Sequence, residues 1–235
     1  VPDFASPEEV STLLAAGREA AAEHDAAVMG PHAARLGVLP GRVRFHVPTK
    51  LDAAAQRVSE SILARALAFL QARLPELGES MLGCAAAELR SLPEAPGLVF
   101  SQEEPAVNVY GVDGEFAPHE DNMDLTVLLP LSPPAAFTGG GTAFWPPELK
   151  DKARQGAKPT LVLAPPAGTA LFFGGEVTHA GRPVVKGARS VWVASFSTKA
   201  SKGSELRQPP ADGASDGRTP SVEEVDAFLA AVGVS

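Results

Sequence analysis

Residues 108–121 read N-V-Y-G-V-D-G-E-F-A-P-H-E-D, and residues 178–184 read T-H-A-G-R-P-V. The two stretches supply a His-x-Asp pair, His119 and Asp121, and a distant His179. Residues two apart in an extended strand project to the same face, so His119 and Asp121 can both reach one metal ion. The imidazole of His179, arriving on a later strand, completes two nitrogens and one carboxylate. This facial set suits non-haem Fe(II) and leaves coordination positions open for substrate and oxygen.

Further polar residues surround this predicted metal site. Arg189 follows His179 by ten residues, and the two glycines and one proline between them allow a turn and a return strand. Its planar guanidinium can form a bidentate bond to a carboxylate, and Arg182 competes for that role. The phenol of Tyr110 can donate to the same carboxylate, and Thr126 can add a hydroxyl. A metal beside a buried cation describes a pocket for a bifunctional organic acid.

The residues after about Met81 have the pattern of a β-rich fold. Short apolar runs alternate with Gly and Pro, and no long helix separates them, which favours an antiparallel sandwich or jelly roll. The runs are residues 97–100, 106–110, 125–131, 142–145, 160–164, 170–173 and 190–197. Gly139 to Gly141 indicates a tight backbone approach. We therefore expect an α+β fold, with a double-stranded β-helix (jelly roll) core and supporting N-terminal helices.

The N-terminal part has helical patterns. Ser6-Pro7-Glu8-Glu9 predicts a capping box that opens a helix running to about Ala27. Residues 43–47 alternate like a short strand. Residues 51–74 carry apolar side chains at helical spacing until Pro75 ends the pattern, and we expect this apolar stripe to pack on a sheet.

We expect one domain over residues 1–235. Within it, 1–80 is mainly helical support and 81–199 is the β-helix core. Residues 200–220 are rich in Ser, Gly, Pro and Asp and predict a flexible loop, and 221–235 predicts a short amphipathic C-terminal helix. Residues 146–150 and the charged stretch behind them are candidate lid elements.

Composition narrows the function classes. The 235 residues are 45% hydrophobic and 20% charged, as in ordinary globular proteins. The net charge of −8 argues against a general affinity for nucleic acid or anionic membrane, because phosphate binding needs clustered Lys and Arg. Cys84 is the only cysteine, so an internal disulfide and a multi-thiolate zinc site are excluded.

Targeting signals are not visible in the sequence. No apolar run reaches the length of a membrane span, and no signal peptide of the usual form is present. The chain begins at Val1 without Met, so we expect a trimmed or mature soluble form, and any targeting segment would lie outside this sequence. Compartment and oligomeric state are left unassigned.

Residues 107–197 resemble a known family, the Fe(II)- and 2-oxoglutarate-dependent dioxygenases, and within it the branch of the prolyl 4-hydroxylase catalytic domain. The ordered set of motifs carries the resemblance. It comprises Tyr110, Phe116, His119-x-Asp121, Thr126, Leu128-Leu129-Pro130-Leu131, Gly139-Gly140-Gly141-Thr142-Ala143-Phe144, Pro166-x-Gly168-x-Ala170-Leu171-Phe172-Phe173 and His179-x-x-x-Pro183-Val184-x-x-Gly187-x-Arg189.

The resemblance implies roles for these residues. His119, Asp121 and His179 would bind Fe(II), Arg189 would bind the distal carboxylate of 2-oxoglutarate, and Tyr110 would assist, with Thr126 nearby. The cofactors implied are Fe(II), the cosubstrate 2-oxoglutarate and O2, with ascorbate as an optional addition. The implied reaction is hydroxylation of an unactivated C–H bond with succinate and CO2 as coproducts.

The substrate implied is a peptidyl proline or other protein side chain, or else a small molecule. The prolyl hydroxylases usually carry Lys where this protein has Arg189, which keeps the cosubstrate but weakens the assignment to proline. Related halogenases lack the carboxylate that Asp121 supplies, so its presence favours hydroxylation or another oxidation.

Two other classes remain alternatives. A non-catalytic β-helix domain could keep the fold and act as a binding or sensing module, although the intact triad and Arg189 favour an enzyme. A cupin-type metalloenzyme shares the fold class but normally uses more His ligands than His119 and His179 provide, and it leaves Arg189 unexplained.

The remaining candidate residues have plainer interpretations. His24, His32 and His46 have no spacing partner and are predicted to be structural or exposed. Phe144 and Trp192 are predicted to pack in the core, whereas Trp145 is a candidate for lining a substrate pocket. For Glu103, Glu104 and Glu120 we expect solvated loop positions, with Glu120 pointing away from the metal.

Overall fold

The computed structural model describes residues 1–29, 41–82 and 98–198. Its N-terminal part contains helices α1 (Pro7–Met29), α3 (Val47–Lys50), α4 (Ala53–Arg73) and α5 (Pro75–Leu82), with strand β1 (Arg42–His46) before α3. The predicted capping box opens α1, because the N–H groups of Ser6 and Glu9 each donate to the other residue's side chain. Asp52 caps α4 by accepting a 2.7 Å bond from the Ala55 N–H.

Pro75 separates two helices. α4 ends at Arg73, as the sequence pattern predicts, because a proline cannot continue the hydrogen-bond ladder. α5 then begins at Pro75 itself, where a proline suits the first helical turn. The sequence pattern did not predict this second helix.

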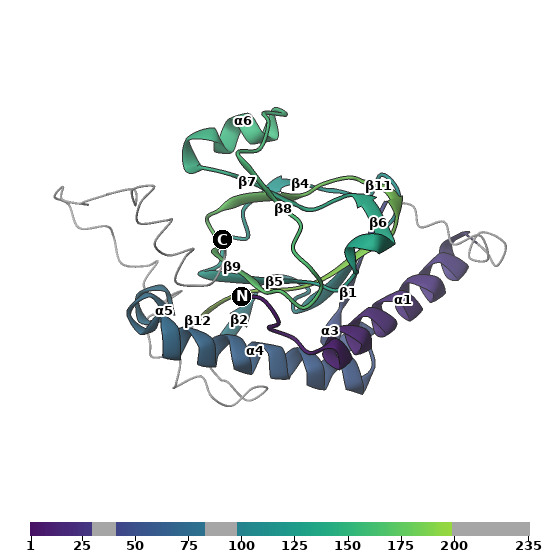
Figure 1. Cartoon of the computed structure of the whole chain (residues 1–235), viewed down its shortest axis with the longest axis horizontal. Helices are drawn as coiled ribbons and strands as arrows, with labels where there is room; N and C mark the ends of the chain where they lie inside the picture. The colour runs from purple at the N-terminus through teal and green to yellow at the C-terminus, as the bar shows by residue number, and fades with distance from the viewer. Residues whose placement is uncertain (30–40, 83–97, 199–235) are drawn as a thin grey trace.

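The large sheet lies against the helices. Its antiparallel strands follow the order β1, β3 (Ala106–Tyr110), β12 (Arg189–Thr198), β5 (Leu125–Pro130) and β9 (Leu171–Gly174), and β2 (Leu98–Phe100) also pairs with β12. Alternate side chains such as Val107, Leu129 and Trp192 point toward α1 and α4 and form the main core with Leu13 and Ile62. The helices run along the outer face of this sheet (Figure 1). The predicted packing of the α4 stripe on a sheet is therefore confirmed.

A smaller sheet forms the side of the roll opposite the large sheet. Its strands are β4 (Phe116–His119), β10 (Thr178–Gly181), β7 (Thr142–Trp145) and β8 (Leu161–Leu163), while β11 (Val184–Gly187) pairs with β6 (Phe137–Gly139). Short 3-10 helices at Pro134–Ala136 and Pro147–Leu149 precede β6 and α6 (Lys150–Arg154). Figure 1 shows the two sheets opposite each other, with α6 on the side away from α1 and α4. The predicted jelly-roll core with supporting helices is confirmed.

The glycine run at residues 139–141 makes the close approach that the sequence predicts. All three residues have positive φ, at +76°, +66° and +92°. A Cβ on Gly140 would lie 3.1 Å from Cδ of Arg189. The run therefore keeps the backbone close to the Arg189 side chain, in a conformation that favours glycine.

Several of the sequence predictions concern residues outside the described ranges. The predicted flexible loop at 200–220 and the C-terminal helix at 221–235 lie outside the described residues, as do His32 and Cys84. Within the described ranges, every helix is too short or too polar to cross a bilayer.

Candidate metal centre and adjoining cavity

Neighbouring strands bring the two histidines together. His179 on β10 is the direct cross-strand partner of His119 on β4, and the ring centroids are 4.3 Å apart. β4 ends at His119, so Asp121 lies just beyond the strand, where its N–H donates to the Gly175 carbonyl at 2.9 Å. The register between β4 and β10 shifts before His119, which is typical of a β-bulge that re-aims a side chain.

The three predicted ligands converge on one point. Asp121 Oδ1 lies 3.5 Å from His119 Nε2, and its Oδ2 lies 3.6 Å from His179 Nε2. One donor atom from each residue falls within 4.8 Å of the other two. Metal bonds of about 2 Å need only a small inward movement from these separations. Two imidazole nitrogens and one carboxylate oxygen fit non-haem Fe(II).

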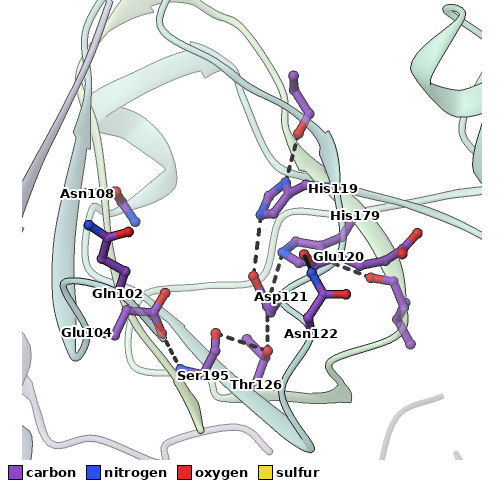
Figure 2. Close-up of polar contacts among 12 residues, drawn as sticks. Gln102, Glu104, Asn108, His119, Glu120, Asp121, Asn122, Thr126, His179 and Ser195 are labelled. Carbon is purple, nitrogen blue, oxygen red and sulfur yellow. Dashed lines mark hydrogen bonds and ion pairs between the residues drawn. The ribbon is translucent and has the colours of Figure 1, made fainter. Parts of the chain in front are cut away.

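Both histidines are oriented by the backbone. His119 Nδ1 lies 2.8 Å from the carbonyl of Ala117, and His179 Nδ1 lies 3.0 Å from the carbonyl of Val177. A carbonyl can only accept, so each Nδ1 carries the proton and donates it. The lone pair of each Nε2 is then free for a metal, as in many metal-binding histidines (Figure 2).

The protonation states also suit a cation. Burial lowers the pKa of His179 below 6.5, against the opposing charge of Asp121, which favours the neutral ring. Burial alone would raise the pKa of Asp121, but the bonds from His119 and Thr126 and the charge of His179 lower it to about 2. With the proton of each histidine on Nδ1, the hydrogen bond from Thr126 still favours the carboxylate. Two neutral imidazoles and an ionised carboxylate are what a metal requires.

Thr126 contacts Asp121 and not the cavity. Its hydroxyl donates to Asp121 Oδ2 at 2.5 Å, and it is fully buried on β5. Ser195 Oγ lies 3.1 Å away and donates to Thr126, since the single Thr126 proton is already given to Asp121. The hydroxyl expected to contact a cosubstrate therefore orients a predicted metal ligand.

Arg189 is a buried cation beside the triad. It is 4% exposed, and its Nη2 donates to Thr142 Oγ1 at 3.1 Å. Among the described residues, no carboxylate lies within ion-pair distance of it, although a buried charge is costly without a partner. The guanidinium lies 5.2 Å from the centre of the Tyr110 ring. Burial raises the pKa of Tyr110, so its phenol is a donor at neutral pH.

One cavity joins these groups. It holds about 380 Å³ of empty space, including the part open to solvent. Its lining includes His119, Asp121, His179, Tyr110 and Arg189. The competing arginine, Arg182, is exposed after β10 and is not among the lining residues. Of the two arginines, Arg189 is therefore the one placed to hold an anionic group.

Glu120 is ion-paired rather than solvated. It points away from the triad, as expected, but its side chain is only 7% exposed. It accepts from Thr178 Oγ1 at 2.8 Å and pairs with Lys150 Nζ at 2.5 Å, with Arg154 3.7 Å away. The Lys150 bond lowers the pKa of Glu120 and keeps it ionised. The candidate lid segment is thus bound to both ligand-bearing strands.

Glu104 is likewise buried, contrary to expectation, whereas Glu103 is exposed. Its Oε1 pairs with Arg44 Nη2 at 2.5 Å, and its Oε2 accepts from the Ser195 N–H. Burial raises the pKa of Glu104, against the charge of Arg44. Together with Asn108, this pair lines the same cavity as the triad. None of these three polar residues is among the site residues predicted from the sequence.

The aromatic residues divide differently from expectation. Trp192 is fully buried and donates to Ser59, as predicted for a core residue. Trp145 is also buried and donates to the Ala157 carbonyl, so it anchors the segment around α6 and does not line the cavity. Phe144 is only partly buried and lies near Phe173 and His179, so its place is beside the metal centre.

Comparison with known proteins agrees with this geometry. Residues 105–196 match the 2OG-Fe(II) oxygenase superfamily. No curated protein sequence matches this one significantly. A viral collagen prolyl hydroxylase from Paramecium bursaria Chlorella virus-1, in complex with 2OG, is similar with a TM-score of 0.50 and 18% identity, over 83% of this chain and 92% of that one.

Two further solved structures are similar at lower scores. AviO1 from Streptomyces viridochromogenes has a TM-score of 0.48 and 13% identity, over 90% of this chain and 89% of that one. The non-haem alpha-ketoglutarate-dependent epimerase SnoN, from nogalamycin biosynthesis, has a TM-score of 0.48 and 17% identity, over 93% and 86%.

The family match and the site together define the class of protein. Over residues 105–196, which carry the triad and Arg189, the chain matches the 2OG-Fe(II) oxygenase superfamily, as its motifs predict. It is an enzyme, and Fe(II), 2-oxoglutarate and O2 are the cofactors of its class.

Proposed function

We propose that this enzyme hydroxylates an unactivated C–H bond, with succinate and CO2 as coproducts. One observation carries the proposal: the His119, Asp121 and His179 donors share a cavity with Arg189, a buried cation without a carboxylate partner among the described residues. An iron site and a separate carboxylate site in one cavity match the two ends of 2-oxoglutarate. Asp121 supports hydroxylation, since the third protein ligand is present.

Each residue has a defined task in this proposal. The Nε2 atoms of His119 and His179 and the carboxylate of Asp121 would hold iron. Arg189 would bind the distal carboxylate of 2-oxoglutarate, with Thr142 fixing the guanidinium and Tyr110 available as a second donor. The iron, when bound, supplies the redox chemistry by which O2 oxidises both 2-oxoglutarate and the substrate. The buried walls of the cavity exclude water from that chemistry.

The substrate has two candidates. A peptidyl proline or other protein side chain is favoured by the motif order and by the fold likeness to a viral collagen prolyl hydroxylase. A small molecule is favoured by the modest size of the cavity and by the charged Arg44–Glu104 pair in its wall. A small-molecule substrate needs no extended groove of the kind that a polypeptide needs.

Anaerobic titration tests the proposed chemistry. Fe(II) and then 2-oxoglutarate are added to metal-free protein while the weak visible metal-to-ligand charge-transfer band is followed. We expect a band that needs both components. Arg189→Met should require far more 2-oxoglutarate to produce it, whereas the exposed control Arg182→Met should behave as wild type.

The contrary outcomes are distinct. Fe(II) binding without a band on addition of 2-oxoglutarate would point to a metalloenzyme of the cupin type. Absence of metal binding would point to a binding or sensing module. Either result would overturn the proposal.

A further inference from the structure

Three polar residues form one wall of the cavity without a role in the chemistry above. Arg44 lies on β1 and Asn108 is its direct partner on β3, while Glu104 precedes β3. Glu104 is held at both oxygens, by Arg44 and by the Ser195 N–H. Figure 2 shows Glu104 linked to Ser195 and, through Thr126, to Asp121. The wall is therefore a fixed part of the site.

This wall has unused hydrogen-bonding capacity. Arg44 Nε is buried without a partner, and it is the one such side-chain atom among the described residues. Asn108 Oδ1 accepts from Arg42 Nη1 at 3.2 Å, so its amide N–H groups are left to face the cavity that Asn108 lines. Each Glu104 oxygen keeps a second lone pair. The Asn108 amide and the Glu104 carboxylate thus offer a donor and an anionic acceptor side by side, next to the Arg44 guanidinium.

Two of the charged residues that line the cavity have no role in binding iron or 2-oxoglutarate. Asp121 belongs to the proposed iron site and Arg189 to the distal carboxylate of 2-oxoglutarate. The remaining charges are one cation, Arg44, and one anion, Glu104, with their atoms 2.5 Å apart. A ligand with a net charge would disturb this balance, and an apolar ligand would remove water from the pair without replacing its bonds. A ligand with adjacent opposite charges satisfies both residues.

The size of the cavity points the same way. Its empty space of about 380 Å³ includes the part open to solvent, so the enclosed part is smaller than this. The same space must also admit 2-oxoglutarate. A compact ligand fits this space better than a peptide does.

We propose that the substrate is a free α-amino acid. Its carboxylate binds Arg44 and Asn108, its ammonium binds Glu104, and its side chain lies in the part of the cavity that the triad lines. This inference rests on the proposed function. The reaction replaces one C–H bond of the amino acid's side group by C–OH; one oxygen atom of O2 enters the hydroxyl and the other enters succinate, as 2-oxoglutarate loses CO2.

Binding can be measured apart from turnover. Mn(II) replaces Fe(II), 2-oxoglutarate is saturating, and calorimetry follows binding of each of the standard aliphatic L-amino acids, including L-proline. The matched probes are the corresponding N-acetyl amino acid amides and a proline-rich peptide. We expect at least one free amino acid to bind and, with Fe(II) and O2, to give a hydroxylated product in step with succinate. Its blocked amide should bind about 10- to 100-fold more weakly.

Variants locate the binding to this wall. Glu104→Gln and Arg44→Gln should weaken binding of that amino acid about 10- to 100-fold while leaving the 2-oxoglutarate charge-transfer band unchanged. Glu103→Gln, next in the sequence but exposed, is the matched control. Asn108→Ala is the milder variant if the ion-pair variants do not fold, and it should weaken the same binding by removing one donor.

The outcomes separate the two proposals. Equal binding of the blocked amides or the peptide, or no binding by any free amino acid in protein that shows the band, would overturn the amino-acid assignment alone. A Glu104→Gln variant that loses 2-oxoglutarate as strongly as the amino acid would place this pair in the cosubstrate site and also overturn it. Absence of the band in wild-type protein would instead refute the proposed function.

Discussion

Thr126 donates its hydroxyl proton to Oδ2 of Asp121 over 2.5 Å. The contact lies on β5, in the large sheet, whereas the histidines lie on β4 and β10 in the small sheet. It therefore ties the carboxylate of the candidate metal centre to the opposite side of the roll. Ser195 on β12 extends the tie by donating to Thr126.

Removal of this hydroxyl should weaken metal binding. Thr126→Val keeps the shape of the side chain but frees Asp121 to rotate, so the Fe(II) dissociation constant should rise about 10- to 100-fold. Thr126→Ser restores a donor at the same position and should recover most of the affinity. Metal titration of the three proteins measures the effect. Equal affinities would show that Thr126 does not orient Asp121.

Arg189→Lys tests the geometry of the proposed carboxylate site. Lys keeps the charge but lacks the planar fork that Arg189 presents beside Thr142. We expect 2-oxoglutarate affinity to fall about tenfold or more, with Fe(II) affinity unchanged. Calorimetric titration at fixed metal gives both constants. A larger loss of 2-oxoglutarate affinity in Arg182→Lys would show that Arg182, and not Arg189, binds the carboxylate.

The metal-free protein should become less stable as the pH falls below 6.5. Burial lowers the pKa of His179 in the folded protein, so below 6.5 the unfolded state takes up a proton at this residue that the folded state resists. The unfolding free energy therefore falls with pH until the lower, folded-state pKa is passed. Each pKa unit of difference contributes about 1.4 kcal/mol. Urea unfolding of wild type and His179→Asn at matched pH checks this, because the variant should lose that part of the pH dependence.

Glu120→Gln should loosen the segment that carries α6. The ion pair joins a buried carboxylate to Lys150 and Arg154, which are 45% and 48% exposed, so solvent screening limits its worth to about 0.5–1 kcal/mol. We expect faster amide exchange in residues 150–154 and a slightly lower melting temperature. Asp151→Asn is the control, since Asp151 is 87% exposed. Identical exchange in both variants would show that Glu120 does not hold α6.

The fold was largely predictable because most of its strands and helices have local signals. The runs at 106–110 and 142–145 match β3 and β7 residue for residue. β6 has only three residues and ends in Gly139, so its identity depends on pairing with β11 rather than on its own pattern. Local propensity cannot report such a pairing.

The site was predictable only in part, for a similar reason. The triad and Arg189 lie in motifs whose order is visible in the sequence. Asn108 could have been found, because it is two residues from Tyr110 on one strand and so shares its face. Glu104 precedes that strand and is buried by Arg44, 60 residues away in sequence. Its burial depends on this long-range ion pair, and its neighbours give no sign of it.

The direct pairing of His119 with His179 has a consequence for folding. Side chains alternate along a strand, so a slip of one residue between β4 and β10 would turn His179 to the other face of the sheet and break up the triad. Only the native register brings all three donors together, so a bound ion would stabilise that register and not the registers shifted by one residue. By mass action, metal binding would thus shift the folding equilibrium toward the correctly paired roll and away from forms with a misaligned strand.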